Sequence, residues 1–346
     1  MHRFYAPSSV ITCKQIDWIR NILRLLIDTD PAMGTLGGDP EDSFAIMLAV
    51  NSPDVNVEGI TIVQGNVPAE KGYSNASHLL TLLDRKDIPL RRGCLRPLNL
   101  ERAVQVKWLE QRYSAIQITE MLDPQGADAD AVGFMVDLVL SNPGEITLLT
   151  IGPLTNVAAA IVQSAGFAAA VKNIVMMGGT AACAGNISPA AEFNFWQDPE
   201  AADIVFNSGA PLTMVGLDVC HQTHLYPKDV DEAAKGGTAL GQFVKEATAP
   251  WFQVMSGAGG SDALHLYDSL AAAVVMEPDI ITTEDSHVAI ETGNGPAQGM
   301  SVSYHKAFQR IVFQKPNINA RVATEVNIER FNSLFQERVL NRIAGK

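Results

Sequence analysis

The chain has 346 residues, of which 47% are hydrophobic and 18% charged, and its formal net charge at pH 7 is −13. This composition excludes a disordered protein and is typical of one large or two smaller globular domains with a sizeable core. The negative charge argues against nucleic acid and anionic membranes as partners.

The four cysteines show no zinc-binding spacing and fit a reducing compartment; they are Cys13, Cys94, Cys183 and Cys220. The sequence contains no run of about eighteen apolar residues, so we expect no membrane span. The N-terminus lacks the pattern of a secretory signal. We therefore expect a cytoplasmic protein.

Residues 1–22 fit poorly with the rest of the chain, and we interpret them as an N-terminal extension of a single domain that covers residues 23–346. Within this domain, short apolar runs alternate with helical segments. The predicted strands are residues 23–28, 57–66, 171–179 and 211–219, together with residues 145–156, which form a strand that runs into a turn. The predicted helices are residues 41–51, 75–84 and 157–164. This alternation predicts an α/β fold with an open, mostly parallel sheet and helices on both faces.

Polar residues gather where the predicted strands end. Asp28 and Asp30 follow the first strand, Asn66 follows the second, and the turn at Gly152 follows the third. Ligands of such sheets bind at the carboxyl ends of the strands, so these residues are expected to meet at one edge of the sheet.

The segment Leu25–Val50 places five acidic residues between two apolar runs, and two interpretations are open. For Asp39 and Glu41 we favour the first interpretation, in which the carboxylates cap a helix and stay solvated. For Asp28, Asp30 and Asp42 we favour a hard divalent cation, Ca²⁺ or Mg²⁺, because crowded carboxylates repel one another unless a cation neutralises them.

Two more segments carry candidate site residues. Asn186, Glu192 and Asn194 offer the donors and acceptors that grip several hydroxyl groups, although Asx turns and a helix cap at Asp198 explain this loop equally well. Asp268 starts an apolar helix, and the simple alternative for it is a helix N-cap.

Several motifs occur in a fixed order: LLIDTDPAM, EDSFAIMLA, TIVQGN, TIGPLTNVAAA, VMMGGT, GNISPAAEFNFWQDPEAA, GLDVCHQ and YDSLAAAVV. Together they resemble the inosine-uridine preferring nucleoside hydrolase family, from Leu23 to about Leu334. The block from Gly185 to Ala202 is the most specific part of this likeness.

The resemblance implies a Ca²⁺-dependent enzyme that hydrolyses the N-glycosidic bond of ribonucleosides to free base and ribose. It implies that a metal-bound water is activated by Asp30 as general base, and that the protein is a homodimer or homotetramer. The implied calcium ligands are Asp30, Asp42, Asp268 and the carbonyl of Ile151, with Asp28 supporting them. The implied substrate-binding residues are Glu41, Asn66, Met177, Asn186, Glu192 and Asn194.

The chain departs from the family pattern in three places. An insertion with Gly34, Gly37 and Gly38 separates the DTDP motif from the helix, and Glu41 stands where the family has an aspartate that meets a ribose hydroxyl; Asp39 is the alternative for that contact. Tyr267 replaces the histidine that protonates the leaving base, which leaves Tyr267 and His265 as candidates for this acid.

The family's histidine–glycine loop is not visible in residues 100–125, where Trp108 and Tyr113 occur instead. Trp108, Tyr113, Trp196 and Trp251 are either base-stacking or packed aromatic residues, with packing favoured.

Two other functions remain open at this point. A nucleoside- or ribose-binding protein of the same fold would bind without turnover, and Glu41 and Tyr267 motivate that alternative. A phosphatase that forms an aspartyl-phosphate would explain the strand ending in Asp28 and Asp30, but it gives no role to the block around Glu192.

Overall fold

The computed structural model describes residues 22–101, 129–257, 262–304 and 317–346. The interpretation of residues 1–22 as an extension, and of Trp108 and Tyr113 as aromatic contacts, therefore lies outside the described residues except for Ile22. Among the described residues, no helix combines the length and apolar character needed to cross a lipid bilayer.

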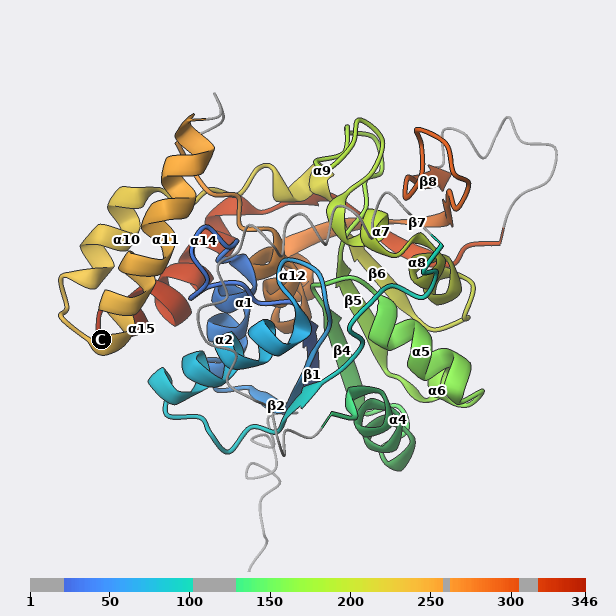
Figure 1. Ribbon diagram of the computed structural model, residues 1–346, viewed down its shortest axis with the longest axis horizontal. Helices are drawn as coiled ribbons and strands as arrows, with labels where there is room; N and C mark the ends of the chain where they lie inside the picture. The colour runs from blue at the N-terminus through green and yellow to red at the C-terminus, as the bar shows by residue number, and fades with distance from the viewer. Residues whose placement is uncertain (1–21, 102–128, 258–261, 305–316) are drawn as a thin grey trace, which may run out of the picture.

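A nine-stranded sheet forms the centre of the described structure, in the order β3-β2-β1-β4-β5-β6-β9-β7-β8 (Figure 1). Its strands are β1 (Leu23–Thr29), β2 (Val55–Ile62), β3 (Leu90–Arg92), β4 (Ile146–Thr150), β5 (Asn173–Met177), β6 (Leu212–Val215), β7 (Ile281–Ile290), β8 (Ser301–Tyr304) and β9 (Ala320–Val326). All pairs from β3 to β9 are parallel, and only β7 pairs antiparallel, with β9 and β8.

Helices lie on both sides of this sheet (Figure 1). They are α1 (Glu41–Val50), α2 (Ala69–Leu82), α4 (Ala131–Ser141), α5 (Thr155–Gln163), α6 (Phe167–Ala170), α7 (Phe193–Gln197), α8 (Pro199–Phe206), α9 (Leu217–Cys220), α10 (Pro227–Ala234), α11 (Ala239–Gly257), α12 (Tyr267–Met276), α14 (Ile328–Phe335) and α15 (Asn341–Ile343). The described residues also form short helical turns at η1 (Pro278–Ile280) and η2 (Gln336–Leu340). The open, mostly parallel sheet predicted from the sequence is confirmed.

Two hydrophobic clusters cover the two faces of the sheet. Successive side chains of a strand point to opposite faces, so Leu25 and Ile27 of β1 join the cluster formed with α1, α2 and α12, while Leu26 joins the cluster formed with α4, α5 and α8. Because both faces of β1 are covered, its middle run Leu25–Ile27 is apolar without alternation, as expected of a buried parallel strand.

Several predicted strands extend beyond the observed ones; the strand predicted over residues 57–66, for example, ends at Ile62. The strand predicted over residues 211–219 ends at Val215, and residues 217–220 form helix α9. Asp218 in α9 accepts hydrogen bonds from the backbone N–H groups of Ala181 and Ala182, at 2.7 and 2.8 Å. The turn after β6 therefore holds the loop that comes after β5.

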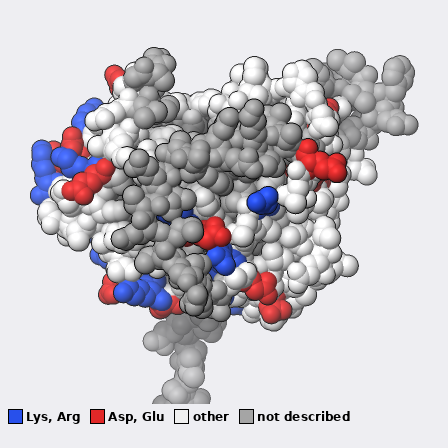
Figure 2. All heavy atoms as spheres, viewed as in Figure 1, with Lys and Arg blue, Asp and Glu red and all other residues white. Residues whose placement is uncertain are grey.

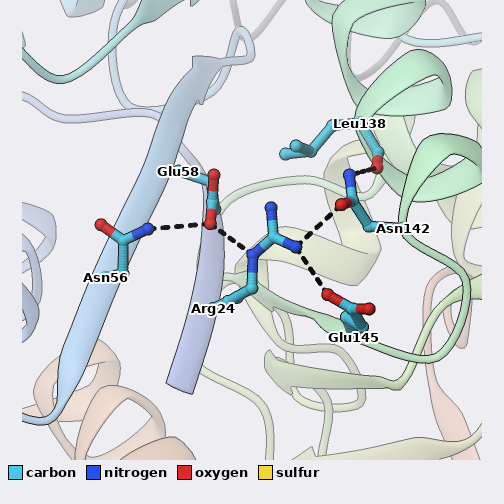
Figure 3. Close-up of polar contacts among 6 residues, drawn as sticks. All are labelled: Arg24, Asn56, Glu58, Leu138, Asn142 and Glu145. Atoms are coloured by element: carbon cyan, nitrogen blue, oxygen red, sulfur yellow. Dashed lines mark hydrogen bonds and ion pairs between the residues drawn. The ribbon is translucent and has the colours of Figure 1, made fainter. Parts of the chain in front are cut away.

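Arg24, near the amino end of β1, links this strand by hydrogen bonds to β2 and to the turn before β4 (Figure 3). Its guanidinium group donates to Glu58 of β2 at 2.5 Å, and to Asn142 and Glu145 in the turn before β4 at 2.8 and 2.6 Å. The carboxylates of Glu58 and Glu145 raise the pKa of Arg24, with the hydrogen bond to Glu58 as the largest cause. The network lies at the opposite end of β1 from Asp30.

Charged side chains are scattered over the face shown in Figure 2. The described Lys and Arg side chains lie there in several small groups, most of them beside Asp or Glu side chains.

We expect Phe44→Ala to destabilise the fold strongly, because Phe44 of α1 is completely buried and its ring packs edge-on against Phe335, with centroids 5.9 Å apart. Losing a buried aromatic ring costs about 3–5 kcal/mol of unfolding free energy, measurable by denaturant titration. Leu36→Ala is the control: Leu36 is 82% exposed, so its removal should change the free energy by less than about 0.5 kcal/mol. Equal effects of the two changes would contradict this packing.

Candidate active site

The predicted site residues meet at the carboxyl ends of four neighbouring strands. Asp30 follows β1, Asn66 lies in the turn after β2, Ile151 follows β4 and Met177 ends β5. The chain leaves β1 towards β2 on one side of the sheet and reaches β4 on the other, so the site lies at a point where the strand order reverses, the usual location of ligand sites in open α/β sheets.

Asp30 and Asp42 lie together beneath this edge of the sheet and are both completely buried. Oδ2 of Asp30 accepts a hydrogen bond from the backbone N–H of Asn66 at 2.6 Å. Oδ1 of Asp42 accepts from the backbone N–H of Asp30 at 3.1 Å and from Oγ1 of Thr29 at 2.5 Å. The amide of Asn66 also donates to Oδ2 of Asp42, at 3.4 Å.

Glycines allow the chain to approach Asp30 closely. A Cβ atom at Gly65 would lie 2.0 Å from Oδ2 of Asp30, and one at Gly152 would lie 2.8 Å from Oδ1. No side chain fits at either position without displacing the carboxylate. The Gly-Asn and Gly-Pro pairs that end two of the predicted strands are therefore needed for the site itself as well as for the turns.

Asp28 supports the site from below rather than lining it. Its Oδ1 accepts from Oγ1 of Thr61 at 2.6 Å and from the side-chain amide of Asn156 at 2.8 Å. Burial raises the pKa of Asp28 to about 7, an effect that these two hydrogen bonds oppose.

The loop before α7 brings the next three predicted residues to the same place. Glu192 caps α7 by accepting from the N–H groups of Asn194 and Phe195, at 2.9 and 3.3 Å, and it also accepts from Gly179 at 2.9 Å. The amide of Asn194 donates to the carbonyls of Met177 and Ile151 at 3.1 and 3.3 Å.

The remaining members of this loop fit both interpretations of its sequence. Oδ1 of Asn186, an exposed residue, accepts from the backbone N–H of Phe193 at 2.9 Å. The expected cap at Asp198 is confirmed, because its Oδ1 accepts from the N–H of Ala201 in α8 at 3.1 Å. The loop thus contains its own caps and also faces the site.

A pocket of about 260 Å³ opens above these residues. Ten of the residues singled out from the sequence line it: Glu41, Asn66, Ile151, Met177, Asn186, Glu192, Asn194, His265, Tyr267 and Asp268. Asp28, Asp30 and Asp42 do not line it and lie deeper. Sequence reasoning left Asp39 and Trp251 only as alternatives, and it missed Ile187, Phe193 and Leu264, whose apolar side chains carried no chemical signal.

Glu41 and Asp268 are buried at the wall of this pocket, and for both of them the simple helix-cap alternative is wrong. Glu41 is not a solvated helix cap: it is 1% exposed and accepts from the backbone N–H of Asp268 at 2.7 Å. Asp268 is not an N-cap, because α12 begins at Tyr267 after Leu266. Asp268 lies in the first turn of the helix and is 6% exposed.

The electrostatics of the site are dominated by buried negative charge. Burial raises the pKa of Asp30, and repulsion from Asp42 raises it further. The pKa of Asp268 is raised by burial and then by the charges of Asp42 and Glu41. Among the described residues, no lysine or arginine forms an ion pair with Asp30, Asp42 or Asp268. The cluster therefore favours a bound cation.

The donor atoms of the site can be compared with what a divalent cation requires. In the part of the chain that the structure describes, no group of three or more His, Cys, Asp or Glu side chains has a geometry that could already hold a metal ion. One oxygen of Asp30 and one of Asp42 hold backbone N–H groups. The other oxygen of Asp30, Oδ1, is buried and has no hydrogen-bond partner. An all-oxygen set with an unsatisfied carboxylate oxygen fits a hard cation such as Ca²⁺.

His265 and Tyr267 both line the pocket, with their rings 5.6 Å apart. Nδ1 of His265 lies 3.0 Å from the carbonyl of Thr223, which assigns the ring proton to Nδ1 in the neutral form. Burial lowers the pKa of His265 and raises that of Tyr267, so near pH 7 the phenol keeps its proton. His221 packs beside both rings and does not line the pocket.

Comparison with known proteins gives a consistent result. The sequence model described as inosine-uridine preferring nucleoside hydrolase matches residues 25–333. The pyrimidine-specific ribonucleoside hydrolase RihA of Photobacterium profundum is 33% identical over 321 residues, which cover 92% of this chain and 98% of that protein.

Solved structures agree with the sequence comparison. A plant nucleoside hydrolase superposes with a TM-score of 0.76 at 30% identity, covering 92% of this chain and 99% of its own. A purine-preferring ribonucleoside hydrolase from Gardnerella vaginalis superposes with a TM-score of 0.77 at 29% identity, covering 93% and 98%. The resemblance seen in the ordered motifs, and the enzyme class of a hydrolase of N-glycosyl bonds, are thereby confirmed: this chain belongs to the inosine-uridine preferring nucleoside hydrolase family.

Proposed function

We propose that this protein is a Ca²⁺-dependent ribonucleoside hydrolase, which cleaves the N-glycosidic bond of its substrate to give free base and ribose. The observation that carries the proposal is the buried Oδ1 of Asp30, which has no hydrogen-bond partner and lies beneath a pocket lined by both polar and apolar side chains. Membership of the family supports the reaction class.

The proposed metal ligands are the carboxylates of Asp30, Asp42 and Asp268 and the carbonyl of Ile151, with Asp28 holding the strand ends below them. When bound there, Ca²⁺ supplies Lewis-acid chemistry, because it lowers the pKa of water and attracts hydroxyl oxygens. Buried carboxylates whose pKa values are raised by mutual repulsion gain most from such a cation.

The sugar is proposed to bind through the polar residues of the pocket wall. The candidates from the loop before α7 are Asn186, Glu192 and Asn194, and those from the strand ends are Asn66 and Met177. Amide and carboxylate groups supply both donors and acceptors, as ribose hydroxyls require. Glu41 and Asp39 add two carboxylates to the same wall.

Asp30 is proposed as the general base. It takes a proton from the attacking water, whose oxygen bonds to C1′ of the ribose while the bond from C1′ to the base nitrogen breaks. Positive charge develops on the sugar during this step, as in other glycosidic cleavages, and the surrounding carboxylates stabilise it. The departing base keeps the bonding electron pair and receives a proton.

Tyr267 and His265 are the proposed donors of that proton. The phenol of Tyr267 keeps its proton near pH 7 and offers a hydrogen bond to the leaving base, whereas His265 donates through Nε2 only when the ring is protonated.

The relatives differ in the nucleobase that their names give as the preferred one, since one is named pyrimidine-specific and another purine-preferring. Release of free ribose from a panel of purine and pyrimidine nucleosides tests the reaction. Binding without release would instead support a nucleoside- or ribose-binding protein.

Asp30→Asn should leave the fold intact and lower kcat by at least ~10²-fold, because the amide cannot accept the proton of the attacking water. The measurement is ribose release under saturating nucleoside, with circular dichroism to confirm folding. Asp279→Asn, at an exposed position, is the control and should keep full activity. Normal turnover by the Asp30 variant would refute its role as base.

Gly65→Ala should lower activity by roughly 10²-fold although it alters no polar group. The added methyl carbon lies 2.0 Å from Oδ2 of Asp30, so the carboxylate has to move, and misplacing a catalytic group by about 1 Å costs that much. Gly295→Ala is the matched control, because a methyl carbon added there meets nothing within 4 Å. If both variants turn over nucleoside at the parental rate, the position of Asp30 is not critical.

Removal of divalent cations should abolish turnover reversibly. A chelator strips the cation from Asp30, Asp42 and Asp268, and the lost rate should return on adding back excess Ca²⁺. Ribose release is followed before chelation, after it, and after addition of Ca²⁺ or Mg²⁺ in separate samples. Full activity in the presence of chelator would rule out the metal in the proposal, and recovery with Mg²⁺ alone would change its identity.

A further inference from the structure

We propose that Glu41 is a positioning residue that fixes Asp268 in place by holding the first turn of helix α12. The inference rests on the proposed function, because Asp268 is one of the proposed metal ligands. This positioning role differs from the contact with a ribose hydroxyl that the family resemblance implies for position 41.

Both carboxylate oxygens of Glu41 are engaged by the start of α12. Oε2 accepts from the backbone N–H groups of Asp268 and Ser269, at 2.7 and 3.2 Å, and Oε1 accepts from the hydroxyl of Ser269 at 3.0 Å. A single side chain thus binds two successive N–H groups and the adjoining hydroxyl of one helical turn.

Helix α12 needs such an acceptor. The first N–H groups of any helix have no partner within the helix, and the residue at the N-cap of α12, Leu266, has no side chain that can accept a hydrogen bond. Glu41 supplies the missing oxygens from 227 residues away. Its negative charge also suits the positive end of the helix dipole.

The geometry links two of the proposed ligands. Glu41 and Asp42 are consecutive in the first turn of α1, and α1 packs directly against α12. Because Glu41 grips the backbone of Asp268, the start of α1 that carries Asp42 is tied to the start of α12 that carries Asp268. An aspartate at position 41 would be one methylene shorter and would not reach the same N–H groups from the same backbone.

Calcium affinity of the full-length protein tests the proposal. The metal-free protein and its variants are titrated with Ca²⁺ alone by calorimetry. Glu41→Gln and Glu41→Asp should both weaken Ca²⁺ binding by about 10–100-fold, the usual effect of losing a residue that orients a metal ligand. Glu41→Asp is decisive, because it keeps the negative charge and loses only the reach.

Two further variants separate positioning from general loss of stability. Ser269→Ala removes one of the three donors and should weaken Ca²⁺ binding in the same direction but less. Asp198→Asn is the matched control: Asp198 is another buried carboxylate that caps a helix, α8, and it does not line the pocket. This change should lower the melting temperature while leaving Ca²⁺ affinity unchanged.

The outcomes are distinguishable. If Glu41→Asp and Ser269→Ala both bind Ca²⁺ within about twofold of the parent, the positioning role is overturned and the proposed function stands. Should the parent itself bind no Ca²⁺, the metal site in the proposed function is wrong, and the inference fails with it.

Discussion

The main physical constraint on this structure is that several carboxylates are buried at the point where the strand order of the sheet reverses. Asp30 and Asp42 are both completely buried, and Glu41 and Asp268 lie within a few per cent of that state. Water that would normally solvate such charges is excluded, and no described basic side chain replaces it at Asp30, Asp42 or Asp268. The arrangement is unfavourable by itself, since each charge opposes ionisation of the next. Backbone N–H groups and a cation are the two means of relieving it, and the fold supplies the first directly.

Those N–H groups come from the turns at the strand ends and from the start of a helix. Asn66 donates to Asp30, Asp30 donates to Asp42, and Asp268 donates to Glu41. Each of these three acceptor carboxylates thus has a backbone contact that fixes its position, while Oδ1 of Asp30 remains without a partner. A site held in this way is organised before a ligand arrives, which reduces the rearrangement that binding and catalysis require.

Much of this could be predicted from the sequence, for identifiable reasons. The run Leu25–Ile27 is apolar on both faces, so the first strand and its burial could be inferred from the pattern alone. Asp28, Asp30 and Asn66 follow strand ends, and parallel strands place their carboxyl ends at one edge, so their proximity could be inferred from topology. The ordered motifs then identified the family.

The errors have a common physical cause, which is that the deciding partner lies far away in the sequence. Glu41 has the local signature of a solvated residue in the first turn of a helix, but its acceptor oxygens serve a helix 227 residues later. Asp218 lies in a run that resembles a strand, and only the tertiary structure shows its carboxylate holding the loop after β5. Apolar residues of the pocket such as Ile187 and Leu264 have no local signal that separates them from core residues.

The apolar part of the pocket also indicates how members of one family can differ in the base that they accept. Phe193 lies in α7, Trp251 in α11 and Leu264 just before α12, so none of them comes from a strand end. Asn66, Ile151 and Met177, by contrast, lie at or just after strand ends. Loops and helices around a site vary more among homologues than the strands that carry it. Changes at the three apolar positions would alter the pocket wall without moving the strand ends, and the relatives named pyrimidine-specific and purine-preferring share the fold.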